Sequence, residues 1–126
     1  MNRQIFISGC VQAFLAVSIG AFGAHALKDV IASDLAGTYD TGTQYHMFHA
    51  IALFVTAHVW SRGGKEAPLK WAGLLFNIGI LLFSGSLYVL AITGIRGLGA
   101  ITPFGGVAFL AGWIMLAISQ VKSDRK

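Results

Sequence analysis

The stretch that decides the fold is residues 71–95, which read WAGLLFNIGILLFSGSLYVLAITGI. It contains no Asp, Glu, Lys or Arg over 25 residues. A helix that crosses the hydrocarbon core of a membrane needs about 20 mostly apolar residues, so this stretch predicts one crossing. A strand of a membrane barrel would instead alternate apolar and polar residues. The run at 78–83, IGILLF, shows no such alternation.

Three further stretches are equally free of charge, namely residues 4–27, 41–61 and 97–121. Lipid cannot hydrogen-bond to an open backbone, so each stretch must form a helix. We predict an all-α integral membrane protein with one transmembrane domain over residues 1–126. Its helices should lie at about 5–27, 43–60, 71–93 and 103–121. Three short connections between them favour an antiparallel bundle of four transmembrane helices.

The composition excludes the common alternatives. Hydrophobic residues make up 56% of the chain, charged residues 11%, and the mean hydropathy is +0.71. A soluble domain carries about 25% charged residues, and a disordered chain is poor in apolar residues. A single cysteine cannot form a disulfide framework.

The basic residues predict the orientation, because loops that stay in the cytoplasm are enriched in Lys and Arg. Seven of the nine fall on one side of the predicted bundle: Arg3, Arg62, Lys65, Lys70, Lys122, Arg125 and Lys126. We therefore place both termini in the cytoplasm. The net charge of +4 is then a topology signal, and no nucleic-acid partner is expected because no folded domain offers a basic face.

The connections carry turn and capping signals. Ser33 is predicted to cap a short outer helix that ends at Asp40 and Gly42. Residues 61–68, SRGGKEAP, predict a cytoplasmic turn. Thr102 followed by Pro103 predicts the capped start of the last helix.

Small residues form stripes on two of the predicted helices. They are Gly9, Ala13, Ala16, Gly20 and Ala24 on the first helix, and Gly105, Ala108 and Gly112 on the last. Small residues let helix backbones approach closely in lipid. These faces therefore predict packing inside the bundle or, as the alternative, a homo-oligomer.

Polar side chains inside a membrane segment are costly and need a role. Most of them fall near the outer ends of the predicted helices, which favours an outer-leaflet polar pocket. Its predicted ligand-binding residues are His25, His49, Tyr88, Arg96 and Thr102. Arg96 beside the start of the last helix favours an anionic group such as a lipid phosphate.

The histidines allow two interpretations. His46 and His49 share a helix face at i, i+3, and His25 can approach from the first helix. Three imidazoles suit zinc, copper or a haem, whereas structural hydrogen bonding is the simpler role. No nucleophile motif, phosphate loop or dinucleotide fingerprint is present, so we expect neither an enzyme nor a cofactor.

Four motifs resemble one family. They are GAFGAHAL at 20–27, YHMFHA at 45–50, LFSGSLY at 82–88 and GAITPFGG at 99–106. In this order and spacing they are similar to the YgdD/YwdK family of small bacterial inner-membrane proteins, a domain of unknown function. The resemblance implies four membrane helices and a multi-pass location in the plasma membrane, and it implies no activity. Position 46 departs from the family pattern, where glutamine is typical, so a shared function would depend on His25 and His49.

These observations favour a non-enzymatic accessory or lipid-interacting bundle, with membrane lipids as its partners. The alternatives from other classes are a redox module that binds haem, copper or a quinone, and a small-solute transporter. A transporter would need a polar path past Ser84 toward Asn77.

Overall fold

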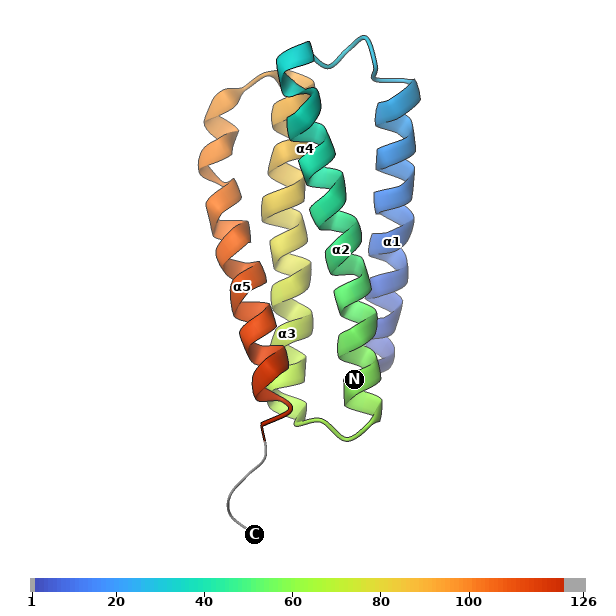
Figure 1. Cartoon of the computed structure of the whole chain (residues 1–126), viewed down its shortest axis with the longest axis vertical. Coiled ribbons are helices and arrows are strands. Elements are labelled where there is room, and N and C mark those ends of the chain that lie inside the picture. The colour runs from blue at the N-terminus through green and yellow to red at the C-terminus, as the bar shows by residue number, and fades with distance from the viewer. Residues whose placement is uncertain (1, 122–126) are drawn as a thin grey trace.

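A computed structural model describes residues 2–121 of the chain. Four long helical rods lie side by side and alternate in direction (Figure 1). Their elements are α1 (Asn2–His25), α2 (Ala36–Ser61), α3 (Glu66–Gly79), the π-helical segment η2 (Ile80–Ser84), α4 (Gly85–Thr93) and α5 (Thr102–Ile118). The third rod is continuous from α3 through η2 to α4. Two short 3₁₀ segments precede α2 and α5, η1 (Ser33–Leu35) and η3 (Arg96–Ala100). The predicted all-α antiparallel four-helix bundle is confirmed.

The four rods differ in polarity. Within residues 2–121, three helices are long and apolar enough to cross a membrane: Asn2–His25, Glu66–Thr93 and Arg96–Ile118. Helix α2 has 26 residues, which corresponds to about 39 Å, but it carries more polar side chains. It packs against α1 on one side and the α3–α4 rod on the other. His46, His49 and Thr56 are buried there, so neighbouring helices shield the polar side of α2 from lipid.

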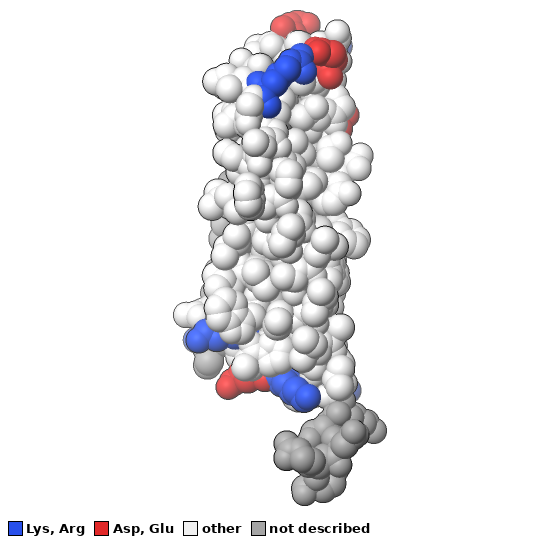
Figure 2. Space-filling view, turned by 90° about the vertical axis from the view of Figure 1, so that its left-hand side faces the viewer, with Lys and Arg blue, Asp and Glu red and all other residues white. Residues whose placement is uncertain are grey.

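Charged residues occupy the two ends of the bundle, and the face in Figure 2 has a charge-free middle. We call one end the basic end; it carries Arg3, Arg62, Lys65, Glu66 and Lys70. We call the other the acidic end; it carries Lys28, Asp29, Asp34, Asp40 and Arg96. Three further cations predicted for the basic end lie outside the described residues: Lys122, Arg125 and Lys126. This segregation agrees with the predicted topology, and the cytoplasmic assignment of the basic end stays a prediction.

Helix α2 begins earlier than predicted. The expected short outer helix is a single 3₁₀ turn that leads directly into α2 at Ala36, and Ser33 makes no capping bond. Gly42 does not end a helix, since it lies inside α2. A Cβ there would approach the Tyr88 ring to 3.0 Å. The role of Gly42 is close packing. The Tyr39 hydroxyl donates to the Ile19 carbonyl at 2.6 Å and anchors this added length of α2 to α1.

One other predicted boundary and one predicted cap are wrong. Helix α3 begins at Glu66, so Pro68 lies in its first turn, where no helical N–H is lost, and not in the preceding loop. Thr102 is the first residue of α5 and does not cap it; its hydroxyl pairs with the Ser86 hydroxyl at 2.6 Å. Pro103 does lie in the first turn of α5, as predicted.

The small-residue stripes serve packing inside the chain. A Cβ on Gly9 would approach Phe54 to 3.1 Å, and one on Gly105 would lie 2.3 Å from the Phe83 backbone nitrogen. Ala16 and Ala108 are also buried. Helix α2 and the α3–α4 rod cover these residues, so they pack inside the bundle, and the homo-oligomer stays a prediction.

Candidate functional site

A chain of hydrogen-bonded polar side chains crosses the interior of the bundle. The Tyr88 hydroxyl lies 2.8 Å from His46 Nδ1, and His46 Nε2 lies 2.9 Å from Gln12 Oε1. Gln12 Nε2 donates to Asn77 Oδ1 at 3.0 Å. Asn77 Nδ2 donates to Ser8 Oγ at 3.3 Å and to the Gly73 carbonyl at 3.0 Å. We call these five side chains the polar chain; it links α1, α2, α3 and α4.

The polar chain has one direction of hydrogen-bond donation. Gln12 Oε1 can only accept, so His46 carries its proton on Nε2, and His46 Nδ1 accepts from Tyr88. Every bond then donates from the Tyr88 side toward Ser8, whose hydroxyl donates in turn to the Ile5 carbonyl at 2.8 Å. A chain in which each donor meets an acceptor is stable in a low-dielectric interior.

His49 has different neighbours, although it lies one turn from His46. Its Nδ1 is 2.9 Å from the Tyr45 carbonyl, so the proton is on Nδ1. Its Nε2 accepts from Trp113 Nε1 at 3.0 Å, and its ring stacks on Phe109 with centroids 3.6 Å apart. The two histidines are therefore opposite neutral tautomers with different neighbours, His46 toward α1 and α4 and His49 toward α5, and both nitrogens of each ring are engaged.

The five residues predicted for an outer-leaflet pocket are not gathered into one site. His25 is exposed at the last residue of α1. Arg96 forms an ion pair with Asp34 at 2.6 Å, both side chains being exposed. Tyr88 belongs to the polar chain, His49 contacts α5, and Thr102 pairs with Ser86. Rotation about the helix axes separates them.

The three-histidine metal site is not assembled either. Within residues 2–121, no group of three His, Cys, Asp or Glu side chains is placed to hold a metal ion. Ser84, which a transporter path was expected to pass, is fully buried and donates to the Gly42 carbonyl at 2.8 Å, so its hydroxyl is engaged within the bundle.

Two residues that organise the interior were missed from the sequence. Gln12 connects α1 to both α2 and α3, and Trp113 provides the donor for His49. A signal for Gln12 existed, because a glutamine in the middle of a charge-free stretch is costly in lipid without a partner. No such signal existed for Trp113, because a tryptophan in a membrane helix needs no polar partner to be expected there.

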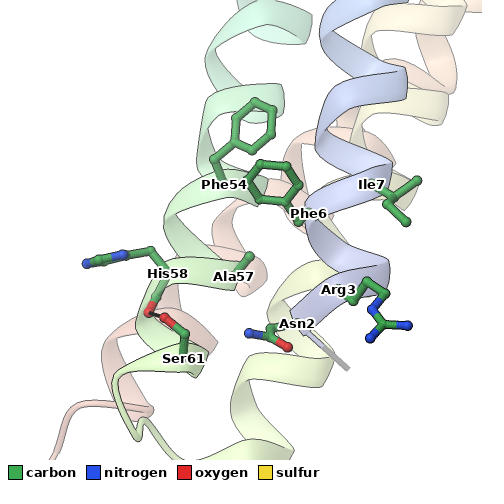
Figure 3. A pocket seen from close by; sticks show the side chains of 8 residues that line it. All are labelled: Asn2, Arg3, Phe6, Ile7, Phe54, Ala57, His58 and Ser61. Carbon is green, nitrogen blue, oxygen red and sulfur yellow. Dashed lines mark hydrogen bonds between the residues drawn. The ribbon is translucent and has the colours of Figure 1, made fainter.

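A groove opens between α1 and α2 at the basic end (Figure 3). It has a volume of about 470 Å³. We call it the α1–α2 groove; it is lined by Asn2, Arg3, Phe6, Ile7, Phe54, Ala57, His58 and Ser61. Phe6 and Phe54 turn toward each other between the helices, with ring centroids 5.0 Å apart, while the polar residues lie nearer the helix ends (Figure 3).

The fold and these contacts define a class, a polytopic helical membrane protein whose interior polar groups are paired with one another. Comparison with known families identifies the group within that class. A family model described as "Protein of unknown function (DUF423)" matches residues 19–106, and the chain belongs to this family. The predicted resemblance to YgdD and YwdK is confirmed.

Curated relatives cover nearly the whole chain. It is 49% identical over 120 residues to "UPF0382 membrane protein YwdK" of Bacillus subtilis (strain 168), covering 95% of this chain and 98% of the relative. It is 44% identical over 120 residues to a "UPF0382 membrane protein" of Staphylococcus epidermidis, covering 95% and 97%. It is 35% identical over 125 residues to "UPF0382 inner membrane protein YgdD" of Escherichia coli (strain K12), covering 99% and 95%. No solved structure matches. The predicted multi-pass membrane location agrees with these names.

Proposed function

We propose that this protein is a non-enzymatic, lipid-interacting membrane bundle. The observation that carries the proposal is the pairing of its interior polar groups. Among the described residues, every buried side-chain nitrogen or oxygen has a hydrogen-bond partner. Catalytic and ligating groups need a lone pair or a proton directed at a substrate, and both buried histidines use theirs for Tyr88, Gln12, Tyr45 and Trp113.

The outer surface supports the same proposal. Large apolar side chains that are more than half exposed occur on every rod, including Phe14, Phe48, Leu81 and Leu110. In a membrane these side chains contact acyl chains, and the grooves between rods open sideways toward lipid. Lipid is therefore the partner that the largest part of this surface fits.

The test is to purify the full chain from its own membrane in a mild detergent. We expect a colourless, metal-free protein by visible absorption spectroscopy and elemental analysis. Native mass spectrometry should show retained phospholipid. A haem or flavin spectrum, a stoichiometric metal, or complete absence of retained lipid would contradict the proposal.

A quinone is the alternative that one specific observation favours. A second groove, of about 480 Å³, lies between α2 and α5 and is walled by aromatic side chains that include Tyr45, Phe48, Phe83 and Trp113. A planar quinone ring can stack on such a wall. Tyr45, which is exposed at the groove, carries a hydroxyl that can donate to a quinone carbonyl.

Trp113 provides a direct test of this alternative. The chain has three tryptophans, so a Trp60→Phe, Trp71→Phe variant leaves Trp113 as the single fluorophore. Quinone binding predicts saturable quenching of its fluorescence by a short-chain quinone in detergent, weakened by Tyr45→Phe. Unsaturable quenching that Tyr45→Phe leaves unchanged would reflect partitioning only and would exclude the quinone site.

A further inference from the structure

We propose that the α1–α2 groove binds the headgroup and upper acyl chain of an anionic phospholipid in the membrane leaflet at the basic end. The inference rests on the proposed lipid-interacting function and deepens it by assigning a site, a leaflet and a headgroup charge. It depends on the order of side chains along the groove, on the charge of that end and on the depth at which the groove lies.

The lining changes from polar to apolar over a short distance along the helices. Asn2 and Arg3 lie in the first turn of α1, and Phe6 and Ile7 lie one turn further in. One helical turn is about 5.4 Å, so the groove passes from the charged end of the bundle into its charge-free middle. An occupant must therefore be amphipathic, with its polar part toward the chain end.

On both helices the groove-lining side chains change from polar to apolar in the same direction. On α2, Ser61 and His58 lie at the polar end of the groove, and Phe54 lies two turns inside. Phe6 and Ile7 are more than half exposed, at 52% and 54%, although both are large apolar side chains. Phe6 lies in the space between the two helices beside Phe54, whereas Ile7 points outward from α1 (Figure 3). An acyl chain along the groove would cover the exposed surface of Phe6.

The charge of this end selects an anionic headgroup. Among the described residues the basic end has four cations and one carboxylate, Glu66. Within residues 2–121, the single ion pair joins Arg96 to Asp34 at the opposite end, so no described carboxylate neutralises Arg3. An arginine guanidinium offers several N–H donors to a phosphate, and Asn2, which also lines the groove, carries an amide donor.

The depth of the groove distinguishes a phospholipid from other anions. A free phosphate or a soluble acidic partner would use Arg3 but would leave the exposed apolar surfaces of Phe6 and Ile7 uncovered. A phospholipid engages both parts at once, with its phosphate at Arg3 and its chain against the Phe6–Phe54 pair.

The experiment compares lipid retention by native mass spectrometry of the full chain, titrated with phosphatidylglycerol or phosphatidylcholine of identical acyl chains. Arg3→Gln should reduce the preference for phosphatidylglycerol about fivefold, because it removes the charge-assisted hydrogen bonds between the guanidinium and the phosphate. Arg62→Gln is the matched control, because it removes one charge from the same end outside the groove. It should reduce the preference by less than about twofold.

A second variant tests the apolar part of the groove. Phe6→Ala should weaken retention of both lipids equally and leave the headgroup preference unchanged, because Phe6 would contact the acyl chain of the lipid and not its headgroup. Phe6 is half exposed, and circular dichroism together with gel filtration verifies that the variants fold. Inorganic phosphate added in excess should not displace the lipid, since it lacks the chain.

The outcomes separate this inference from the proposed function. Equal losses from Arg3→Gln and Arg62→Gln would mean that only the general charge of the basic end attracts the lipid, and would overturn the site. Displacement by inorganic phosphate would replace the phospholipid with a free anion and would overturn it as well. Either result leaves retained lipid in place and the lipid-interacting function intact. A wild-type protein that retains no lipid at all contradicts the function itself.

Discussion

The α1 interface and the α5 interface hold helices together in different ways. Helix α1 is attached by hydrogen bonds, from Gln12 to His46 and Asn77 and from Tyr39 to the Ile19 carbonyl. Helix α5 is attached mainly by shape. Phe109 occupies the space over Gly79, Phe76 packs on Gly112, and Gly105 lies against the backbone at Phe83.

The difference shows which force operates where. Lipid tails are as apolar as leucine, so no hydrophobic effect draws membrane helices together. Close packing and hydrogen bonds remain. The α1 interface uses both, since Gly9 also packs against Phe54, whereas the α5 interface depends mainly on packing. The interface of α5 should therefore be sensitive to added volume, and the interface of α1 to the loss of polar partners. Each prediction below is measured as a free energy of unfolding, by titration of reconstituted protein with dodecyl sulfate followed by circular dichroism.

The largest expected effect is at the α5 interface. Gly105→Ala would place a Cβ 2.3 Å from the Phe83 nitrogen and 2.7 Å from its Cα, and backbone cannot move aside as a side chain can. We expect a loss of about 2–3 kcal/mol from overpacking. Gly106→Ala is the control, because its Cβ would lie 3.8 Å from the Phe83 ring. It should be neutral or should stabilise by up to about 1 kcal/mol through helix propensity. Equal effects of the two substitutions would refute the packing explanation.

The second effect is at the α1 interface. Gln12→Leu leaves the His46 Nε2–H and Asn77 Oδ1 without partners inside the bundle. We expect a loss of about 1–2 kcal/mol, near the upper limit for side-chain hydrogen bonds in membranes. Gln44→Leu makes the same change at an exposed position on α2 and should not destabilise the protein. A stable Gln12→Leu protein would mean that the polar chain does not hold α1.

A smaller effect is expected at the hydrogen bond between Trp113 of α5 and His49 of α2. Trp113→Phe keeps an aromatic ring on α5 and removes the donor to His49 Nε2. Single hydrogen bonds between membrane helices contribute about 0.6 kcal/mol on average, which is the expected loss. Trp71→Phe, at an exposed site on α3, is the matched control. A double-mutant cycle with His49→Phe should give a coupling energy of similar size, and zero coupling would contradict the hydrogen bond.

The smallest effect is expected outside both interfaces. The ion pair between Asp34 and Arg96 joins the segments before α2 and α5 at the acidic end, and its side chains are 63% and 65% exposed. Exposed pairs contribute about 0.2–1 kcal/mol at most, and salt screens them. Asp34→Asn should cost less than about 0.5 kcal/mol, with the difference disappearing in high salt. A salt-independent loss above 1 kcal/mol would instead indicate that this contact is shielded from solvent in the membrane.

Much of the fold was predictable because it depends on the hydropathy and charge of short stretches of the chain. Hydropathy and charge add up residue by residue along the chain, and the cost of placing them in lipid is nearly independent of the neighbours. The four helices, their antiparallel order and the charged ends followed from this. Helix boundaries were less predictable. Gly42 and Pro68 look like helix breakers, but one serves close packing against Tyr88 and the other lies in the first turn of α3.

The candidate site was less predictable, as the histidines illustrate. The spacing of His46 and His49 places both on one broad face of a helix, which favoured a shared role. The structure turns one toward Gln12 and Tyr88 and the other toward Trp113 and Phe109. No motif indicated that α2 lies between two different neighbours.

The sequence by itself determined that the helices are surrounded by lipid, and it determined the secondary structure and the alternating direction of the rods. The reason is that lipid imposes the same requirement on every backbone group it surrounds. Only the tertiary structure decided which polar side chains pair and where the surface is grooved. Those properties depend on how each helix is rotated and on which residue lies opposite it. Gln12 meets His46 across 34 positions of sequence, and His49 meets Trp113 across 64. Such partners are set by the packing of whole helices, and no local pattern records them.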